Sequence, residues 1–307
     1  MARASFRVSA PGKLMLLGEH AVLHGSHCLV CGVSQRLSII VTPRQDRRLI
    51  IRSALGNYEA TLDSVSPSPQ FRFILAAVNQ FPQPLTTGLE LEVHSDFSAD
   101  VGLGSSAAVT AAVGAALCQL TLKNVERQKV FDFGLQVIRS VQGTGSGADL
   151  AASVFGGVLL YRAEPFTCER LDNLYPISVV YSGAKTPTTQ VIARVEESRR
   201  RFSELFDAIF GIMDKSALWA AEAIRADDWR TFGELLNLNQ GLMDAIGVSN
   251  ARLAQIVYAL RAQPGILGAK ISGSGLGDCV VGLGDAGVDC GYEVLPIQMS
   301  REGIRID

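Results

Sequence analysis

The sequence predicts an α+β protein with two lobes, and three observations support this prediction. The chain has 307 residues, of which 48% are hydrophobic, so it can bury one large core or two of ordinary size. Its first half mixes apolar, β-branched segments with helical ones. From residue 190 to about residue 262 apolar residues recur with helical spacing, and short strands follow. We expect the lobes to comprise residues 1–162 and 163–307.

The first lobe is expected to contain strands at 6–9, 28–41, 49–62, 89–93 and 158–161. Pro67 and Pro69 interrupt the chain, and residues 70–80 then have the apolar spacing of an amphipathic helix. Another helix is expected to begin at Ser105 or Ser106 and to end near residue 120. Its alanine-rich sequence is apolar on nearly every side, which is typical of a helix buried inside a lobe. A further helix is expected at 130–141.

The second lobe is expected to begin with a strand at 177–181. The long helical region after it has predicted stops near Gly247 and Pro264. Short strands are expected at 279–283 and 293–297. The sequence contains no internal repeat and no low-complexity tract.

Composition favours a small-molecule partner. The net charge is −2 with acidic and basic residues interspersed, so neither a nucleic acid nor an anionic membrane surface is an expected partner. The six cysteines lack the spacing of metal ligands and are expected to be reduced, mostly buried thiols. No secretion signal and no run of about 18 apolar residues is evident, so a cytoplasmic location is expected.

One glycine-serine segment, Gly102-Leu103-Gly104-Ser105-Ser106-Ala107, joins a strand-like region to the start of the buried helix. The first N–H groups of a helix have no partner within it and lie at the positive end of its dipole, so they suit phosphate oxygens. Glycine lets a bulky anion approach the backbone, and serine hydroxyls can bind phosphate or magnesium. By itself, the pattern fits a tight turn with a serine N-cap equally well.

Two more glycine-rich segments occur later in the chain. Residues 273–277 precede an apolar strand and fit a hairpin connection as well as a ligand-binding loop. Residues 143–149 match the loose dinucleotide pattern G-x-G-x-x-A, but they follow a helical stretch instead of a strand, which argues against an oxidoreductase. The chain has no G-x-x-x-x-G-K-[ST] loop, no H-R-D or D-F-G motif and no G-x-S-x-G elbow, so P-loop enzymes, protein kinases and common hydrolases are disfavoured.

Three segments together resemble the signature motifs of the GHMP kinases, in the same order and with matching spacing. They are PGKLMLLGEHAV at 11–22, GLGSSAA at 102–108 and KISGSG at 270–275. The resemblance covers almost the whole chain. It implies the GHMP kinase fold, with a first lobe like domain 2 of ribosomal protein S5, a ferredoxin-like second lobe and the active site between them. The first motif is most similar to that of mevalonate kinases, whereas residues 142–153 also resemble phosphomevalonate kinases.

The resemblance gives each motif residue a role. The segment from Ser146 to Asp149 is similar to the catalytic S-G-x-D segment, so Asp149 would engage the substrate hydroxyl, with Lys13 as its charged neighbour. A carboxylate can accept the proton of an alcohol, and an ammonium group stabilises charge during phosphoryl transfer. The substrate would be bound by Lys13, Glu19, His20, Asp149 and Thr188. The competing role of His20 is a histidine packed in a turn, and that of Thr188 is a helix N-cap.

ATP and Mg²⁺ are the cofactors that the resemblance implies. The nucleotide would be held by Gly102, Leu103, Gly104, Ser105, Ser106, Ala107, Gly273, Ser274 and Gly275. Mevalonate kinases normally carry a magnesium-holding glutamate eleven residues before the catalytic aspartate, where this chain has Ile138. An apolar side chain cannot bind a hard cation, so the metal would depend on Ser105 or Ser106, phosphate oxygens and water, with Asp149 as a further candidate. Asp278, where the family commonly has glycine, is expected at the edge of the third loop and has no expected role.

The implied activity is transfer of the ATP γ-phosphate to the 5-hydroxyl of mevalonate in isoprenoid biosynthesis. Phosphomevalonate or another small alcohol stays open as the substrate, and Lys185 or Arg139 could then meet an additional phosphate. A non-catalytic ligand-binding protein of the same fold is a third hypothesis, which Ile138 keeps open. A homodimer is expected by analogy with the family.

Overall fold

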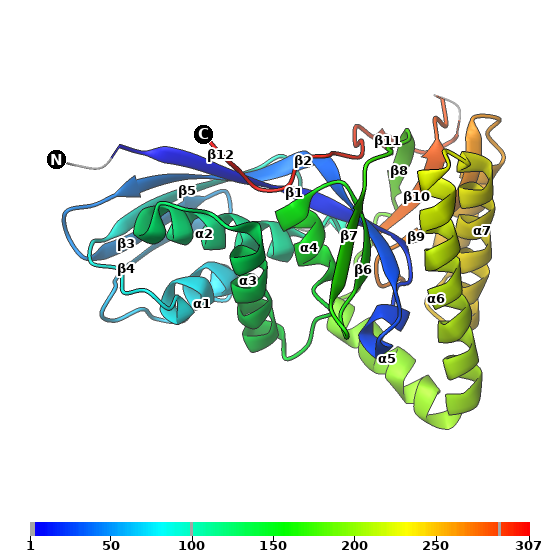
Figure 1. Cartoon of the computed structure of the whole chain (residues 1–307), viewed down its shortest axis with the longest axis horizontal. Coiled ribbons are helices and arrows are strands. Elements are labelled where there is room, and N and C mark those ends of the chain that lie inside the picture. Colours follow the sequence, from blue (N-terminus) through cyan, green and yellow to red (C-terminus); the bar gives the residue numbers. More distant parts are fainter. Residues whose placement is uncertain (1–3, 99–100, 288–289) are drawn as a thin grey trace.

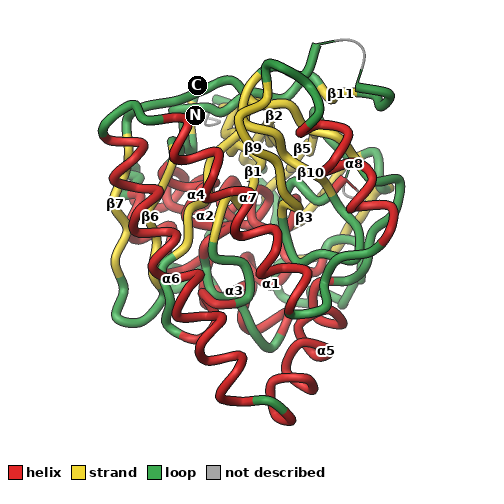
Figure 2. The backbone as a smooth tube through the Cα atoms, turned by 90° about the vertical axis from the view of Figure 1, so that its right-hand side faces the viewer, coloured by secondary structure: helices red, strands yellow, loops and turns green. Residues whose placement is uncertain are grey.

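Two β-sheets with helices beside them make up the chain, as the computed structural model shows for residues 4–98, 101–287 and 290–307. Eight strands form the first sheet and four form the second. Most of the first sheet and its helices lie in the left and middle of Figure 1, and the second sheet with α6 (Ser203–Arg225) and α7 (Trp229–Ala245) lies on the right. Figure 2, seen from the side of α6 and α7, shows these helices in front of the strands.

The first sheet has the strand order β12-β1-β2-β5-β3-β4, and β6 and β7 extend it beside β2. Its strands are β1 (Phe6–Leu17), β2 (Cys28–Pro43), β3 (Arg48–Ser53), β4 (Gly56–Thr61), β5 (Leu89–Ser95), β6 (Val158–Arg162), β7 (Thr167–Leu171) and β12 (Arg305–Ile306). Strand β2 is long enough to pair with β6 through its first residues and with β5 through its last. Only the β3–β5 pairing is parallel among the neighbours that the structure describes.

Strand β1 is longer than predicted, because both of its faces are buried. Val8, Ala10 and Met15 belong to the core that the sheet forms with its helices. Leu14 and Leu16 belong to a second core, shared with α6, α7 and the second sheet. The alternation of faces that identifies a half-exposed strand is therefore absent. The first motif continues the strand, with an irregularity in the pairing between Pro11 and Lys13.

Four helices cover the first sheet: α1 (Arg72–Gln80), α2 (Ser105–Leu122), α3 (Arg127–Gln142) and α4 (Ala148–Phe155). Helix α2 is the central one, since it packs on β1, β2 and the other three helices. By length and hydropathy it could also cross a membrane, but 67% of it is buried inside the protein. Its position in the core accounts for its apolar sequence, as predicted for a helix buried within a lobe.

The second half begins with β8 (Ile177–Tyr181) and contains α5 (Thr188–Arg201), α6 (Ser203–Arg225), α7 (Trp229–Ala245), α8 (Ala251–Arg261), β9 (Ile266–Ser272), β10 (Cys279–Gly284) and β11 (Val294–Leu295). The long helical region is thus four helices, and only the break near Gly247 was expected within it. Strands β7, β9 and β12 were not predicted. The third glycine-rich segment joins β9 to β10, which pair as an antiparallel hairpin. A short 3₁₀ helix, η1 (Ala21–His24), follows β1.

The predicted lobe boundary after residue 162 lies between β6 and β7, which pair with each other in the first sheet. The last strand of the chain, β12, returns to pair with β1. Backbone hydrogen bonds consequently join Arg7 and Asp307, and β12 lies beside β1 in Figure 1. The boundary stays a prediction.

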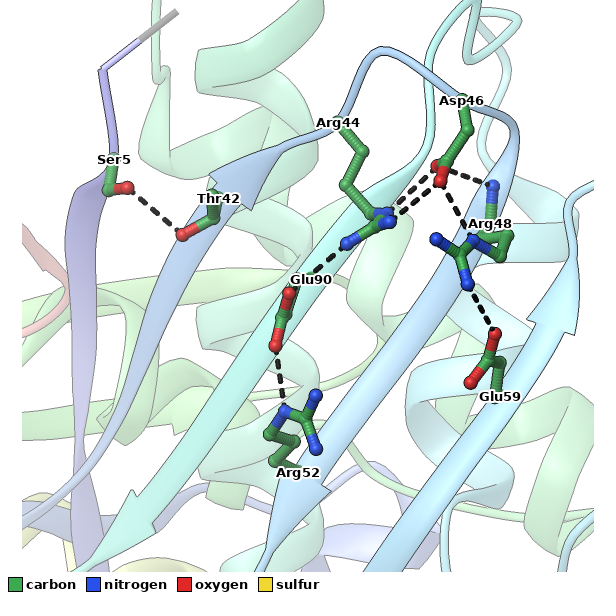
Figure 3. A network of polar contacts seen from close by, with 8 residues as sticks. All are labelled: Ser5, Thr42, Arg44, Asp46, Arg48, Arg52, Glu59 and Glu90. Carbon is green, nitrogen blue, oxygen red and sulfur yellow. Dashed lines mark hydrogen bonds and ion pairs between the residues drawn. The ribbon is translucent and has the colours of Figure 1, made fainter.

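A network of charged side chains covers β3, β4 and β5 at the end of the first sheet that lies opposite α6 (Figures 1 and 3). Arg44 binds Asp46 at 2.6 Å and Glu90 at 3.2 Å, and Arg52 binds the other oxygen of Glu90 at 2.7 Å. Most of these side chains are exposed, and exposed ion pairs contribute little to stability. None of them lines the cleft described next.

Candidate active site

A cleft of about 670 Å³ brings together residues from all three sequence motifs. Its walls come from the end of β1, the start of α2, the catalytic segment before α4, the start of α5 and the turn between β9 and β10. Of the predicted site residues it is lined by Lys13, Glu19, His20, Gly102, Gly104, Ser105, Ser106, Ala107, Asp149, Thr188, Gly273 and Ser274. Leu103 and Gly275 do not line it. The Leu103 side chain lies in the core, and Gly275 packs against Val248.

The start of α2 forms one wall of the cleft. Gly104 precedes the helix with φ 75°, a left-handed conformation that favours glycine, and no side chain caps the helix. The alternative of a serine N-cap is therefore wrong. A Cβ atom at Gly104 would lie 2.8 Å from Cγ of Lys13, so glycine is also needed for the close approach of that side chain. The free N–H groups of the first turn border the cleft and suit an anion.

Lys13 and Asp149 form an ion pair inside the cleft, with 3.2 Å between Nζ and Oδ2. The lysine side chain is 6% exposed and the aspartate side chain 46% exposed. Burial disfavours the lysine charge, but Asp149, Asp278 and Glu19 outweigh this effect and hold the pKa of Lys13 above its usual value. A fixed cation therefore lies beside a carboxylate that a substrate can reach.

Tyr161 of β6 binds the backbone of the segment from Ser146 to Asp149. This tyrosine is fully buried, and its hydroxyl donates to the backbone carbonyl of Ser146 at 2.5 Å. Gly147 lies directly over the hydroxyl, since a Cβ at this position would be 2.7 Å away from it. Sequence patterns alone did not identify Tyr161, because a tyrosine in an apolar strand is usually a core residue.

Glu19 lines the cleft and also contacts the second half of the chain. Its carboxylate is 2% exposed and forms an ion pair with Lys270 of β9, whose side chain is completely buried. The amide of Asn239 on α7 donates to its second oxygen at 3.3 Å. Although Glu19 borders the cleft, both oxygens are occupied, so it links β1 to the second half of the chain. Burial lowers the pKa of Lys270, and Glu19 opposes that effect.

His20 also reaches the second half of the chain. Its Nε2 donates to the carbonyl of Ser274 at 2.8 Å, which leaves only Nδ1 for a ligand. Burial lowers the pKa of His20, so the neutral ring is favoured. Thr188 is the first residue of α5 and lines the cleft, whereas Pro187 occupies the N-cap. The competing role of Thr188 as an N-cap is thus wrong.

The sequence did not predict that Asp278 lies in the cleft. It lines the cleft and is 5% exposed, rather than lying at the edge of the loop. Burial raises the pKa of its carboxyl, while the charges of Lys13 and Lys185 oppose the shift. One sequence feature could have indicated a role for this residue: an aspartate stands where the third motif usually has glycine.

The residues around the start of α2 fit a magnesium ion that arrives with a nucleotide. Ser105 and Ser106 offer hydroxyl oxygens there, but Ile138 also lines the cleft and contributes none. Among the described residues no group of three or more His, Cys, Asp or Glu side chains could hold a metal by itself. Phosphate oxygens would therefore have to complete the coordination.

The six cysteines are all free, and five of them are buried, as predicted. Cys28 and Cys31, the closest pair in sequence, lie in the cores on β2.

The fold and the cleft together define a GHMP kinase. Residues 72–157 match the family described as "GHMP kinases N terminal domain", and residues 220–288 match "GHMP kinases C terminal". The mevalonate kinase of Archaeoglobus fulgidus is 34% identical over 300 residues, which cover 97% of this chain and 99% of that protein. That of Thermococcus sibiricus is 30% identical, with 97% of each chain covered. The protein belongs to the mevalonate kinase family of GHMP kinases.

Solved structures confirm the predicted fold. The L. major mevalonate kinase in complex with R-mevalonate superposes with a TM-score of 0.80 at 23% identity, covering 99% of this chain and 100% of that one. Lactococcus lactis galactokinase complexed with galactose gives a TM-score of 0.84 at 20% identity, covering 99% and 95%. At these identities the likeness concerns the fold alone.

Proposed function

We propose that the protein phosphorylates the 5-hydroxyl of mevalonate with ATP, in the cytoplasm and as a step of isoprenoid biosynthesis. The observation that carries the proposal is the Lys13–Asp149 pair, which faces the cleft beside the start of α2. A nucleotide phosphate bound at that helix end would lie next to the one carboxylate–ammonium pair of the predicted catalytic residues. The named relatives support mevalonate as the alcohol.

Each cleft residue has a chemical task in this reaction. Asp149 is exposed enough to accept a hydrogen bond from the substrate hydroxyl and then its proton. Lys13 stays charged and stabilises the oxygen that attacks the γ-phosphate. The N–H groups of the first turn of α2 bind phosphate oxygens. Bound magnesium would neutralise phosphate charge, and Ser105 or Ser106 would hold it.

The walls of the cleft suit a small alcohol with an apolar part. Val22, Leu23 and Ile192 line it together with the polar Thr188. Of the two cations considered for a phosphorylated substrate, Lys185 lines the cleft, whereas the guanidinium of Arg139 donates to the carbonyl of Gly145 and does not line it. Lys185 is therefore the residue on which phosphomevalonate, the second candidate substrate, would depend.

An ADP-release assay with mevalonate, phosphomevalonate, galactose and homoserine tests the proposal. We expect turnover with mevalonate and at least about a hundredfold loss in Asp149→Asn, because an amide cannot accept the proton. Turnover with phosphomevalonate and none with mevalonate would show that the substrate is wrong. Activity unchanged in Asp149→Asn would remove its catalytic role, and absence of turnover with every alcohol would favour the non-catalytic hypothesis.

We also propose a homodimer as the working assembly. Helix α6 carries an exposed apolar row of Leu205, Ile212 and Trp219, which are 63%, 46% and 68% exposed and seven residues apart. Such a row lies on one side of a helix and offers an apolar contact surface to a second copy. Sedimentation analysis of the protein and of Trp219→Glu would test this assembly, and a monomer at micromolar concentration would contradict it.

A further inference from the structure

Asp278 ends the turn between β9 and β10 and lies against the phosphate-binding segment at the start of α2. A Cβ atom placed on Gly102 would be 2.7 Å from its Oδ1, so the carboxylate touches the backbone of that glycine. The residue has φ 62°, a left-handed conformation that aspartate adopts less readily than glycine. The backbone conformation at this position favours glycine, so it does not account for the presence of an aspartate side chain.

The carboxylate of Asp278 lacks a partner for one of its oxygens. The residue is 5% exposed, and its Oδ1 is buried without a hydrogen-bond partner among the described residues. Lys13 and Lys185 attract this carboxylate, but its pKa is still raised, so the loss of hydration on burial outweighs the attraction. A contribution to stability therefore does not explain this side chain. A cation that binds during function would explain it.

The arrival of a nucleotide makes the need for a cation greater. The start of α2 attracts phosphate oxygens, and the charge of Asp278 beside Gly102 repels them. A divalent ion between the carboxylate and the phosphates converts this repulsion into attraction. Magnesium is commonly bound by one or two carboxylates together with phosphate oxygens. Ile138 cannot supply such a carboxylate, so the cleft needs it from elsewhere.

We propose that Asp278 is the carboxylate ligand of the magnesium ion that accompanies ATP, with Ser105 or Ser106 and phosphate oxygens as further ligands. The third motif thereby supplies the acid that is absent from α3. This inference rests on the nucleotide binding in the proposed function, but it is independent of which alcohol is phosphorylated.

Manganese is a suitable probe, because the free ion is measured by electron paramagnetic resonance. Mn²⁺ is titrated into the wild-type protein with ADP, and into Asp278→Asn and Asp278→Gly under the same conditions. Asparagine and glycine both tolerate the positive φ, so the variants should fold. We expect the Mn²⁺ affinity of the ADP complex to fall at least about tenfold in both variants. ADP affinity measured in EDTA should be unchanged or higher, since a negative charge has been removed.

Asp172→Asn is the matched control. Its side chain is 81% exposed and does not line the cleft, so the same loss of charge should alter neither affinity. Unchanged Mn²⁺ affinity in both Asp278 variants would overturn the inference, even if turnover fell, because Asp278 would then only position Lys13. Failure of the wild type to bind ADP would overturn the inference and the proposed function together. If Asp278 governs Mn²⁺ binding while mevalonate is not phosphorylated, the inference stands and only the proposed substrate is wrong.

Discussion

Glu19 and Lys270 form an ion pair in which the lysine side chain is 0% and the glutamate side chain 2% exposed. Glu19 follows β1 in the first motif, and Lys270 lies on β9 three residues before Gly273, which begins the third glycine-rich turn. Because both side chains are buried, the pair holds in place the cleft walls that the two halves of the chain contribute. Two of the three family motifs are thus connected through the protein interior.

Removal of one partner of this pair should destabilise the protein strongly. Lys270→Met leaves the Glu19 carboxylate buried without its counter-charge, which typically costs about 3–5 kcal/mol. In the double variant Glu19→Gln, Lys270→Met no charge is left, so we expect a clearly smaller loss. Urea unfolding measures the free energy of unfolding of each. Equal losses in the single and double variants would contradict the role of the pair.

Gly104→Ala should damage the site beyond its effect on stability. The left-handed backbone costs a non-glycine residue about 1–2 kcal/mol, and the new methyl group would also push against Lys13. We expect kcat/KM to fall at least about tenfold, because a displacement of about 1 Å in an active site has effects of this size or larger. Gly247→Ala is the control: its φ is 77°, and a Cβ there meets no atom within 4 Å. Comparable kcat/KM values in the two variants would show that contact with Lys13 is unimportant.

The neutral state of buried His20 predicts a loss of stability in acid. Its folded pKa lies below the usual 6.5, chiefly because of burial, while the Ser274 carbonyl and Glu19 act in the opposite direction. The unfolded chain therefore takes up this proton more readily, so the stabilisation is present above about pH 6.5 and is lost as pH falls towards the folded pKa. His20→Asn tolerates the positive φ and cannot titrate.

The free energy of unfolding of the wild type and of His20→Asn should be compared between pH 7.5 and pH 5.5. We expect the difference in the free energy of unfolding in favour of the wild type to shrink as pH falls, since the other titrating groups are common to both proteins. An advantage that is independent of pH would show that His20 titrates alike in the folded and unfolded chains.

Buried thiols should be slow to react in the folded protein. Burial raises the pKa of Cys31 and Cys279 to about 12 and that of Cys168 to about 11. Since the thiolate is the nucleophile, about one part in a thousand of Cys168 is reactive at pH 8. With a colorimetric disulfide reagent we expect less than one equivalent to react within minutes, and six after unfolding. Cys168→Ser should remove the slow native reaction, and rapid reaction of two or more thiols would contradict this prediction.

The motifs made the Lys13–Asp149 pair in the cleft predictable, because Lys13, Gly104 and Asp149 each lie in a segment whose residue types suit phosphoryl transfer. Lys270 was less accessible to sequence reasoning: its strand is short and contains Gly268, and its partner lies 251 residues away. Asp278 was missed for a related reason. Its significance comes from burial against Gly102, which spacing along the chain cannot reveal. Sequence periodicity identified helices well, but it could not separate strand β1 from a loop once both faces were buried.

Tyr161 should act on turnover through the catalytic segment that it supports. In Tyr161→Phe the carbonyl of Ser146 loses its donor, so the segment that carries Asp149 is less well fixed. We expect kcat to fall about tenfold with KM little changed, because the substrate-binding walls are intact. Tyr58→Phe is a matched control, since its hydroxyl also donates to a carbonyl, that of Ser66 at 2.7 Å, but lies outside the cleft. Steady-state kinetics decide the matter: equal kcat in the two variants would mean that Tyr161 only fills the core.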